Sequence, residues 1–361
     1  MKIRDRYIAK TLLSYTLVVL LVWLSIYSFF NFLTELNSVG QKDYGILSAF
    51  KYIVLQMPEV AYNQASPVIL LGCILGMGHL ATTGQLLIFR VSGASILKIT
   101  GITLKNALIF VIAIIAIGEL LAPMSSNFAE LSRSNALGDN IVSTSQEGFW
   151  IREGDSFINV KKNIDGKIFA GVTVIEVNSS NKIERVIKSE NAVFDGISLI
   201  DMNSTKIFSI DDSSVIDTIS LKERNSYNKT VSFDQDLIDS LKKEPKDLTT
   251  WTIIKQIQFL SDNKLRSGVF EVELYKRLIK PVTLVAMILL AMLFIFGSTR
   301  DTTLGRKIFF GVALGLSFEM LSRIASAMSL SFDFNPLMSA ILPSTIVMLI
   351  SITLLIQKSI S

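Results

Sequence analysis

Cysteine and histidine are almost absent from this sequence, which has one of each among its 361 residues. With Cys73 alone, the chain cannot form an internal disulfide, so every folded part must be held together by packing. His79 has no cluster of cysteines or carboxylates around it, which is a poor basis for a metal site. We therefore interpret both residues as structural, and we expect neither a metal centre nor a cofactor.

The sequence also lacks the motifs of self-contained catalysis. It contains no Gly-x-x-x-x-Gly-Lys-Ser/Thr phosphate loop, so the chain is not expected to hydrolyse ATP. It has no His-Glu-x-x-His, no Gly-x-Ser-x-Gly and no paired aspartates within an apolar stretch. These absences argue against an enzyme, and any energised work would have to draw its energy from a partner protein.

Charged residues make up only 18% of the chain and hydrophobic residues 50%, and most of the charge lies outside long apolar runs. At ~1.5 Å per residue, each run can cross a hydrocarbon core of roughly 30 Å as a helix. A polar segment, residues 123–273, divides the runs three and three. The pattern predicts an α-helical polytopic membrane protein with six transmembrane helices and an inserted water-soluble domain. The runs are residues 11–34, 65–82, 99–122, 281–299, 308–330 and 334–357.

Basic residues gather on one side of these runs. The loop after the first run has only Lys42 and Lys51, and the loop after the fifth run has none. By the positive-inside rule, both termini are expected in the cytoplasm and the inserted domain on the opposite side of the membrane. The basic residues before the first run, in the second and fourth loops, and after the last run are Lys2, Arg4, Arg6, Lys10, Arg90, Lys98, Arg300, Arg306, Lys307 and Lys358.

The inserted segment is rich in short runs of β-forming residues separated by Asp, Asn, Ser and Gly. Many short strands at this spacing are typical of a β-sandwich or a jelly roll, so we expect an all-β domain. From Leu248 the apolar residues, Leu265 included, recur at helical spacing to about Gly268, and a second helix at residues 269–280 is predicted to run into the fourth span. The predicted strands are residues 149–152 and 156–160, which flank a turn at residues 153–155, and residues 171–177, 192–194, 206–210 and 215–221.

The loop between the second and third runs has the pattern of a short helix. Thr82-Thr83-Gly84-Gln85 gives a polar start, residues 86–91 are mostly apolar, and Ser92-Gly93 gives a glycine stop. Two interpretations remain open on these residues: a docking element for a cytoplasmic partner, or an interfacial turn between two spans.

Several stretches spread over the whole chain resemble one family, the LptF/LptG permeases of the lipopolysaccharide-export ABC transporter, and LptG more than LptF. The likeness is carried by residues 5–11 (DRYIAKT), 85–93 (QLLIFRVSG), 118–123 (GELLAP), 146–150 (QEGFW), 273–281 (ELYKRLIKP) and 294–297 (FIFG). The resemblance implies that residues 1–122 hold membrane helices 1–3, with a cytoplasmic coupling helix at 83–93. It also implies that residues 123–268 form a periplasmic jelly-roll-like β-domain ending in a helical segment, and that residues 269–361 hold helices 4–6.

The resemblance also implies a function. The chain would be a permease subunit of the bacterial inner membrane that extracts lipopolysaccharide and passes it, through its periplasmic domain, toward the outer membrane. The implied partners are a sister permease of LptF type, a cytoplasmic ATPase dimer of LptB type, a membrane-anchored bridge protein of LptC type and the periplasmic bridge, but no nucleic acid. Two other functions stay open on the residues alone: a permease for another lipidic cargo, such as lipoprotein release, whose subunits usually have four spans, or a non-transporting scaffold.

The coupling residues implied by the resemblance lie in the short cytoplasmic helix. Family members often begin this helix with a glutamate that pairs with a basic residue of the ATPase. Gln85 stands there in this chain, so a neutral hydrogen bond would replace a charge-assisted one. The residues expected to contact the ATPase are Gln85, Leu86, Leu87, Phe89 and Arg90.

The first and fifth runs are implied to border a lateral opening for lipopolysaccharide. Asn31 occupies a position where some relatives carry a lysine that meets lipid A phosphates. In the fifth run, Glu319 and Arg323 are spaced i, i+4 and share one helix face. Charged residues in a membrane usually face partners or a cavity. We interpret this pair either as self-neutralising or as supplying, through Arg323, a replacement cation for a phosphate.

Overall fold

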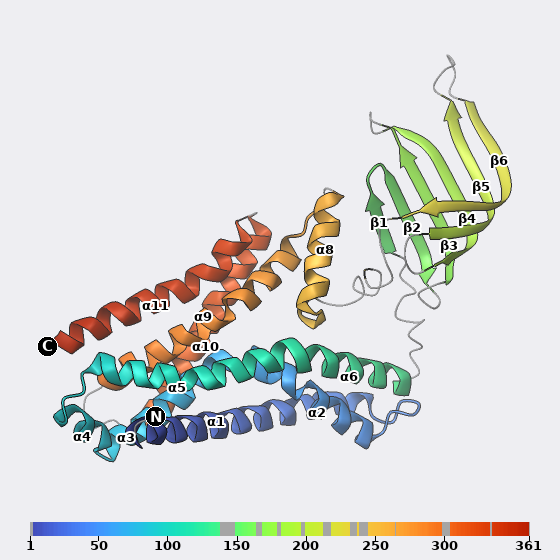
Figure 1. Cartoon of the computed structure of the whole chain (residues 1–361). Helices are drawn as coiled ribbons and strands as arrows, with labels where there is room; N and C mark the ends of the chain where they lie inside the picture. The colour runs from blue at the N-terminus through green and yellow to red at the C-terminus, as the bar shows by residue number, and fades with distance from the viewer. Residues whose placement is uncertain are drawn as a thin grey trace. The chain divides into compact units, whose positions relative to one another are not determined.

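The computed structural model describes residues 3–137, 149–163, 168–178, 182–195, 199–211, 218–231, 237, 245–263, 265–297, 304–332 and 334–360. The chain divides into two compact units, which we call the membrane unit and the β unit (Figure 1). The membrane unit holds Met1–Val39, Gly45–Glu130 and Glu271–Ser361, and the β unit holds Gly40–Tyr44 and Leu131–Phe270. Sequence expectations that fall outside the described residues concern Lys2, Arg300 and residues 146–148, 215–217 and 298–299.

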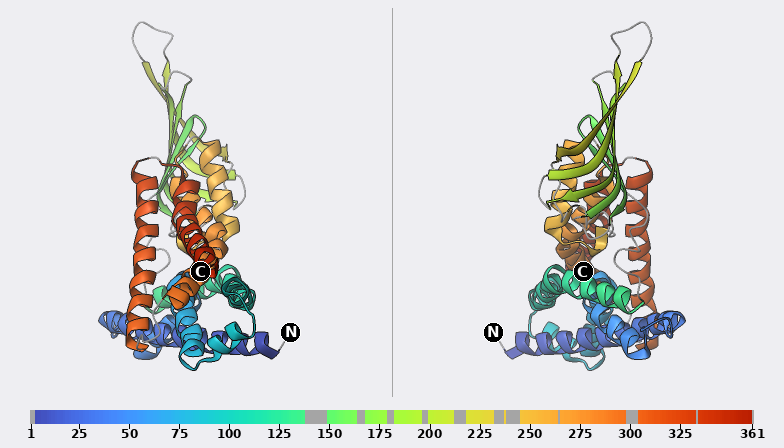
Figure 2. Two further views of the ribbon diagram at one scale, coloured as in Figure 1. Left: turned by 90° about the vertical axis from the view of Figure 1, so that its left-hand side faces the viewer. Right: turned by 90° about the vertical axis from the view of Figure 1, so that its right-hand side faces the viewer.

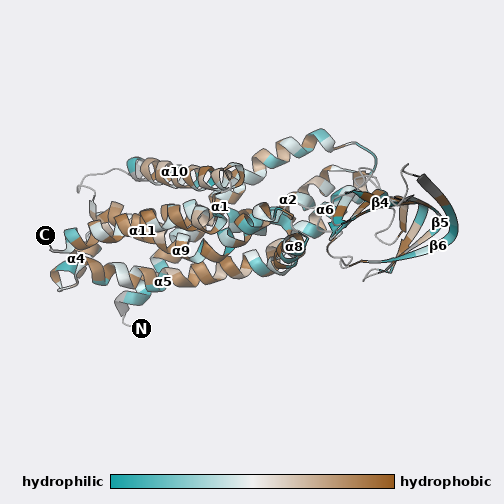
Figure 3. Cartoon of the chain, turned by 90° about the horizontal axis from the view of Figure 1, so that it is seen from above, coloured by the Kyte–Doolittle hydropathy of each residue, from teal (hydrophilic) through white to brown (hydrophobic). Residues whose placement is uncertain are grey.

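The prediction of six membrane-crossing helices is confirmed. Apolar residues dominate the helices, as the hydropathy colours of Figure 3 show. The third span runs on through a π-helical turn, η2 (Ile117–Leu121), into α6 (Ala122–Leu137). This turn contains Glu119, whose carbonyl loses its usual donor because Pro123 has no N–H. The spans lie in α1 (Ile3–Glu35), α3 (Ala65–Thr82), α5 (Ile96–Ala116) with η2 and α6, α9 (Gly268–Gly297), α10 (Leu304–Ser331) and α11 (Pro336–Ile360).

A helix, α2 (Ile46–Asn63), precedes the second span where the sequence analysis placed a loop. It is not among the candidate spans. Its buried residues, Ala49, Ile53, Val60 and Ala61, recur on one face of the helix. An amphipathic helix of this kind has no continuous apolar run, which explains why a search for such runs passes over it.

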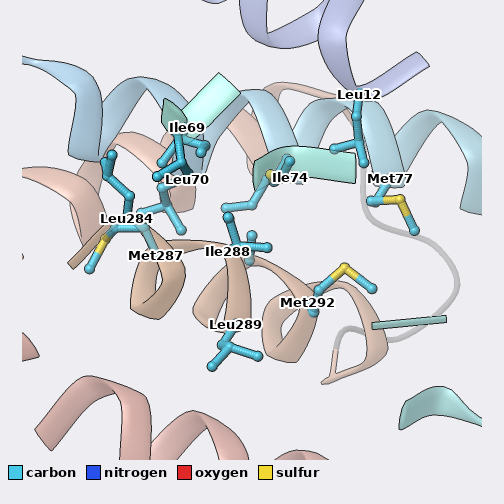
Figure 4. Packing of buried hydrophobic residues seen from close by; sticks show 14 of the residues in the cluster. Leu12, Ile69, Leu70, Ile74, Met77, Leu284, Met287, Ile288, Leu289 and Met292 are labelled. Atoms are coloured by element: carbon cyan, nitrogen blue, oxygen red, sulfur yellow. The ribbon is translucent and has the colours of Figure 1, made fainter. Parts of the chain in front are cut away.

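The core of the membrane unit is built around α3. Cys73 is completely buried there, and the ring of His79 packs on Tyr15 of α1 with the centroids 5.5 Å apart. Both residues therefore have the packing roles expected from the sequence. Figure 4 shows Ile69, Leu70, Ile74 and Met77 of α3 facing Leu284, Met287, Ile288 and Met292 of α9.

Two pairs of glycines at i, i+4 let neighbouring helices approach α3 closely. A Cβ added at Gly72 of α3 would lie 2.6 Å from Thr16 Oγ1 of α1, and Gly76 faces the same helix one turn later. On α10, Cβ atoms added at Gly311 and Gly315 would lie 2.8 and 3.0 Å from side chains of α3. These two Gly-x-x-x-Gly spacings are readable in the sequence, and they fix α1 and α10 on α3.

The β unit contains an antiparallel sheet of six strands in sequence order. The predicted turn at residues 153–155 is confirmed, and Gly154 adopts a φ of +56°, which suits glycine. The later strands are longer than predicted because pairing with a neighbour holds polar residues in extended conformation, most clearly where β6 pairs with β5 along its whole length. The strands are β1 (Phe149–Glu153), β2 (Ser156–Asn163), β3 (Ile168–Val177), β4 (Ile183–Phe194), β5 (Leu199–Asp211) and β6 (Thr218–Thr230).

The sheet is strongly curled. Lys229 on β6 donates hydrogen bonds to Glu176 Oε1 on β3 at 2.8 Å and to Ser156 Oγ on β2 at 3.0 Å. Because β4 and β5 separate β3 from β6, these two strands would lie about 14 Å apart in a flat sheet. The strands bend round and bring them together (Figures 1 and 2). The inserted β-domain is therefore confirmed as one antiparallel sheet, a six-stranded meander that curls.

A helix follows the sheet, as predicted. α8 (Thr250–Asp262) is capped by Thr249, whose hydroxyl accepts a hydrogen bond from the Thr252 N–H at 3.2 Å. Its buried Phe259 joins the core of the sheet, where Phe169 and Phe194 stack with centroids 5.8 Å apart. The helix ends before Leu265, three residues earlier than its apolar spacing indicates. The predicted helix at residues 269–280 is confirmed as the first part of α9.

Replacing Gly72 with alanine should destabilise the membrane unit, because the new methyl group would overlap both backbone and side chain of Thr16. Overpacking of this kind costs about 1–3 kcal/mol. Gly101→Ala in α5 is the matched control, since a Cβ there meets nothing within 4 Å. Thermal unfolding of the purified protein in detergent should show a lower midpoint for Gly72→Ala alone. Equal midpoints for the two variants would contradict the close contact between α1 and α3.

Candidate functional site

The short helix predicted between the second and third spans is present as α4 (Gln85–Val91). The chain leaves α3 through Gly84, whose φ of +74° favours glycine, and enters α5 after Gly93, whose φ is +83°. The Thr83 hydroxyl donates to the His79 carbonyl at 2.8 Å, and the Ser95 hydroxyl accepts from the Lys98 N–H at the start of α5 at 3.2 Å. Both turns around α4 are therefore hydrogen-bonded, and the helix has a defined place between α3 and α5.

The two faces of α4 have different environments. Leu86 is buried, and Phe89 packs against the core of the membrane unit. On the other face, Leu87 is 52% exposed, Ile88 65% and Val91 81%. These three side chains, with Ser92, line a shallow hollow that is almost entirely apolar. An apolar hollow on an exposed helix is suited to receive a partner protein.

The structure therefore divides the predicted coupling residues. Leu86 and Phe89 hold the helix on the core, Leu87 belongs to the exposed hollow, and Arg90 is exposed beside it. Ile88 and Val91 are further members of the hollow that the sequence prediction left out. Their spacing from Leu87, one and four residues, places all three on one helix face and is the signal that could have found them.

Gln85, at the start of α4, has an unsatisfied amide. Its Oε1 atom is buried and accepts no hydrogen bond from any residue that the structure describes. A buried acceptor without a donor costs about 1–3 kcal/mol. Because the atom is inaccessible in the chain alone, a donor from another protein would reach it only after the Gln85 side chain turns outward.

The predicted gate residues lie on two helices. On α10, Arg323 Nε donates to Glu319 Oε1 at 3.2 Å, so the expected i, i+4 pair is formed. The Arg323 side chain is nevertheless 71% exposed, against 28% for Glu319. Asn31 lies partly buried on α1, and among the described contacts it makes no hydrogen bond with either residue of the pair.

The part of the chain that the structure describes contains no group of three or more His, Cys, Asp or Glu side chains placed to hold a metal ion.

Comparison with known proteins decides the family. Residues 6–357 match the family described as the lipopolysaccharide export system permease LptF/LptG. The chain belongs to the LptF/LptG family. Two similar relatives are the lipopolysaccharide export system permease protein LptG of Escherichia coli (strain K12) and that of Haemophilus influenzae, each 25% identical over 98% of both chains.

The resemblance drawn from short sequence stretches is thus confirmed over nearly the whole chain. All the relatives reported at this level of similarity are LptG proteins. The protein is a multi-pass membrane protein with six candidate spans and an inserted six-stranded β-sheet. Members of this family are transmembrane permease subunits that are not known to hydrolyse ATP themselves.

Proposed function

We propose that this chain is an LptG-type subunit that extracts lipopolysaccharide from the inner membrane and passes it, through the β unit, toward the outer membrane. A separate ATPase would drive the process. The proposal is carried by the family match over residues 6–357 together with the exposed apolar hollow on α4. The six candidate spans also favour lipopolysaccharide export over lipoprotein release, whose permeases usually have four.

An Lpt transporter complex is implied by the family, and we infer where its members bind. The outer faces of α1 and α10 are apolar and exposed, as at Phe30 (63%) and Met320 (63%), which suits a sister permease of LptF type and lipid. α4 is the inferred dock for an LptB-type ATPase dimer. The β unit is the inferred contact for an LptC-type bridge protein and the periplasmic bridge, because an exposed sheet edge can accept a further strand.

We infer that the coupling segment, residues 83–93, faces the cytoplasm and that residues 123–268 face the periplasm. Three basic residues support this orientation: Arg90 in α4, Lys98 in the first turn of α5 and Arg306 in the first turn of α10. Basic residues at span ends are typical of the cytoplasmic side.

Cysteines placed in the β unit and on α4 test the orientation. In a Cys73→Ala background, Asp155→Cys at the β1–β2 turn should react with a membrane-impermeant thiol reagent in intact spheroplasts. Val91→Cys, 81% exposed on α4, should react only after permeabilisation. The reverse pattern would overturn the orientation.

The face of α4 that carries the hollow is the inferred ATPase contact. We infer that lipopolysaccharide enters a cavity between the spans. This cavity and the ATPase would then be coupled mechanically, because α4 is joined to α3 and α5 by two hydrogen-bonded turns. ATP-driven closure of the ATPase would bias a two-state rearrangement of these helices and expel the lipid from the cavity. Gln85 Oε1 would accept a hydrogen bond from the ATPase where relatives use a carboxylate.

Leu87→Asp and Ile88→Asp should each release the ATPase from the purified complex, because a charge buried in the contact loses its hydration. Leu47→Asp, at an 81% exposed position of α2, is the control and should retain the ATPase. Phe89→Asp is not suitable, since Phe89 packs against the core and its loss would disturb folding. The measurement is the ratio of ATPase to permease after affinity purification. Full retention in both hollow variants would rule out this surface as the dock.

Arg323 is the inferred contact for a lipid A phosphate. It lies fifteen residues past Ile308, or ~22 Å along the helix from the start of the span, in the outer half of the membrane. Its guanidinium keeps most of its exposure although Glu319 binds Nε, so its remaining N–H groups can form charge-assisted hydrogen bonds with a phosphate.

Arg323→Ala should lower the crosslinking of lipopolysaccharide to a photoreactive residue at Ile324 by about tenfold, because a hydrogen bond between charged groups is lost. Arg323→Lys keeps the charge and should retain most of the crosslinking. Both variants should assemble with their partners. Undiminished crosslinking in Arg323→Ala would leave the self-neutralising pair as the sole role of Arg323.

A further inference from the structure

The helix break between α2 and α3 leaves a backbone carbonyl without its helical donor. In a continuous helix the Asn63 carbonyl would accept from the N–H of residue 67, but Pro67 has none. The chain passes the break at Gln64, with φ −91° and ψ 8°, and starts α3 at Ala65. Next to hydrocarbon, an unsatisfied carbonyl costs several kcal/mol, so another donor is required.

Lys280 of α9 supplies that donor from 217 residues away in the sequence. Its Nζ donates to the Asn63 carbonyl at 3.2 Å. The same ammonium lies 5.2 Å from the centroid of the Tyr62 ring, within reach of a cation–π interaction. The positive charge therefore sits at the C-terminus of α2, where the helix dipole favours a cation.

The helix α10 passes the same break. A Cβ added at Gly315 would lie 3.0 Å from Pro67 Cβ, so α10 touches the proline itself. Glu319 follows Gly315 by four residues and lies on the same face, one turn farther along. Because Gly311 lies against Leu71 and Gly315 against Pro67, α10 runs antiparallel to α3, and this register brings Glu319 level with the α2–α3 break where Lys280 binds.

The carboxylates around Lys280 are also engaged by arginines. Glu273 is bound by Arg277 at 3.1 Å, in a pair whose arginine side chain is only 7% exposed. Lys276 repels Lys280. Glu319 itself is shared, because its Oε1 also accepts from the exposed Arg323. Glu319 therefore binds the exposed Arg323 and, by the register of α10 on α3, lies level with Lys280.

We propose that Lys280 is a positioning residue that ties α10 to the α2–α3 break, by donating to the Asn63 carbonyl and attracting Glu319. These two interactions set the resting position of α10. The helix can move away from α3 only when the attraction between Glu319 and Lys280 is lost. A phosphate bound to Arg323 would repel Glu319 and so favour its interaction with Lys280. Without a phosphate, Arg323 competes with Lys280 for Glu319. The role of Lys280 in positioning α10 can be measured without cargo, but the effect on transport rests on the proposed function.

The test measures the position of α10 in the assembled complex. Spin labels are placed at Met320→Cys on α10 and Ile109→Cys on α5, 63% and 55% exposed, in a Cys73→Ala background. Lys280→Met and Glu319→Gln should each broaden or shift the distance distribution between the labels. Lys280→Arg should preserve it, and so should the control Lys276→Met on the same helix. The double variant Lys280→Met with Glu319→Gln should change the distribution no more than the larger of the two single changes, because both side chains act through one shared interaction.

The outcomes separate the tie from a general loss of stability. If Lys280→Met does not assemble, Lys280→Gln, which keeps a donor for the Asn63 carbonyl but removes the charge, replaces it in the same scheme. Additive effects of Lys280 and Glu319 changes, or an unchanged distribution in the single variants, would overturn the proposal. Lipopolysaccharide transport by the reconstituted complex should fall about fivefold in Lys280→Met and should fall no further in the double variant. If the wild-type complex transports no lipopolysaccharide, the proposed function is wrong. The distance between the spin labels still tests the role of Lys280.

Discussion

The burial of α3 on almost all sides is the constraint on which the membrane unit depends. No hydrophobic force drives helices together inside a bilayer, so α3 must be held by close packing and by hydrogen bonds between helices. Gly72 lets α1 pack closely on one face of α3. Gly311 of α10 lets that helix pack closely on another face. The apolar side chains of α9 cover a third face. Any displacement of one neighbour must be accommodated at α3, and α3 is joined at one end directly to α4.

The two ends of α3 show how a membrane helix can be interrupted. Toward α4, the chain turns at Gly84, and the backbone N–H and the hydroxyl of Thr83 both donate to the His79 carbonyl. Toward α2, the carbonyl that Pro67 leaves free is bound by Lys280 from a distant helix. A local partner makes the first turn self-contained. The α2–α3 break depends on a remote partner, so its structure depends on where α9 and α10 lie. For this reason we propose that Lys280 is a positioning residue.

The β unit obeys a different constraint, because its strands must satisfy their own backbone groups and still bury an apolar face. Consecutive antiparallel pairing achieves the first, and curling achieves the second by folding the sheet around its own core. Lys229, Glu176 and Ser156 connect strands that would be far apart in a flat sheet. The ion pair between Lys229 and Glu176 is therefore direct evidence of how strongly the sheet curls.

The sequence by itself determined the six spans, the inserted β-strands, the short helix at residues 85–91 and the family, because hydropathy, periodicity and glycine stops are local properties. It also contained the signals for Gly72 and Pro67, but not what those residues touch. Only the tertiary structure decided that Leu86 is buried while Ile88 is exposed, that the sheet curls, and that Lys280 reaches Asn63. Burial and pairing depend on residues that are distant in the sequence, so they cannot be predicted from the sequence of a single helix or strand.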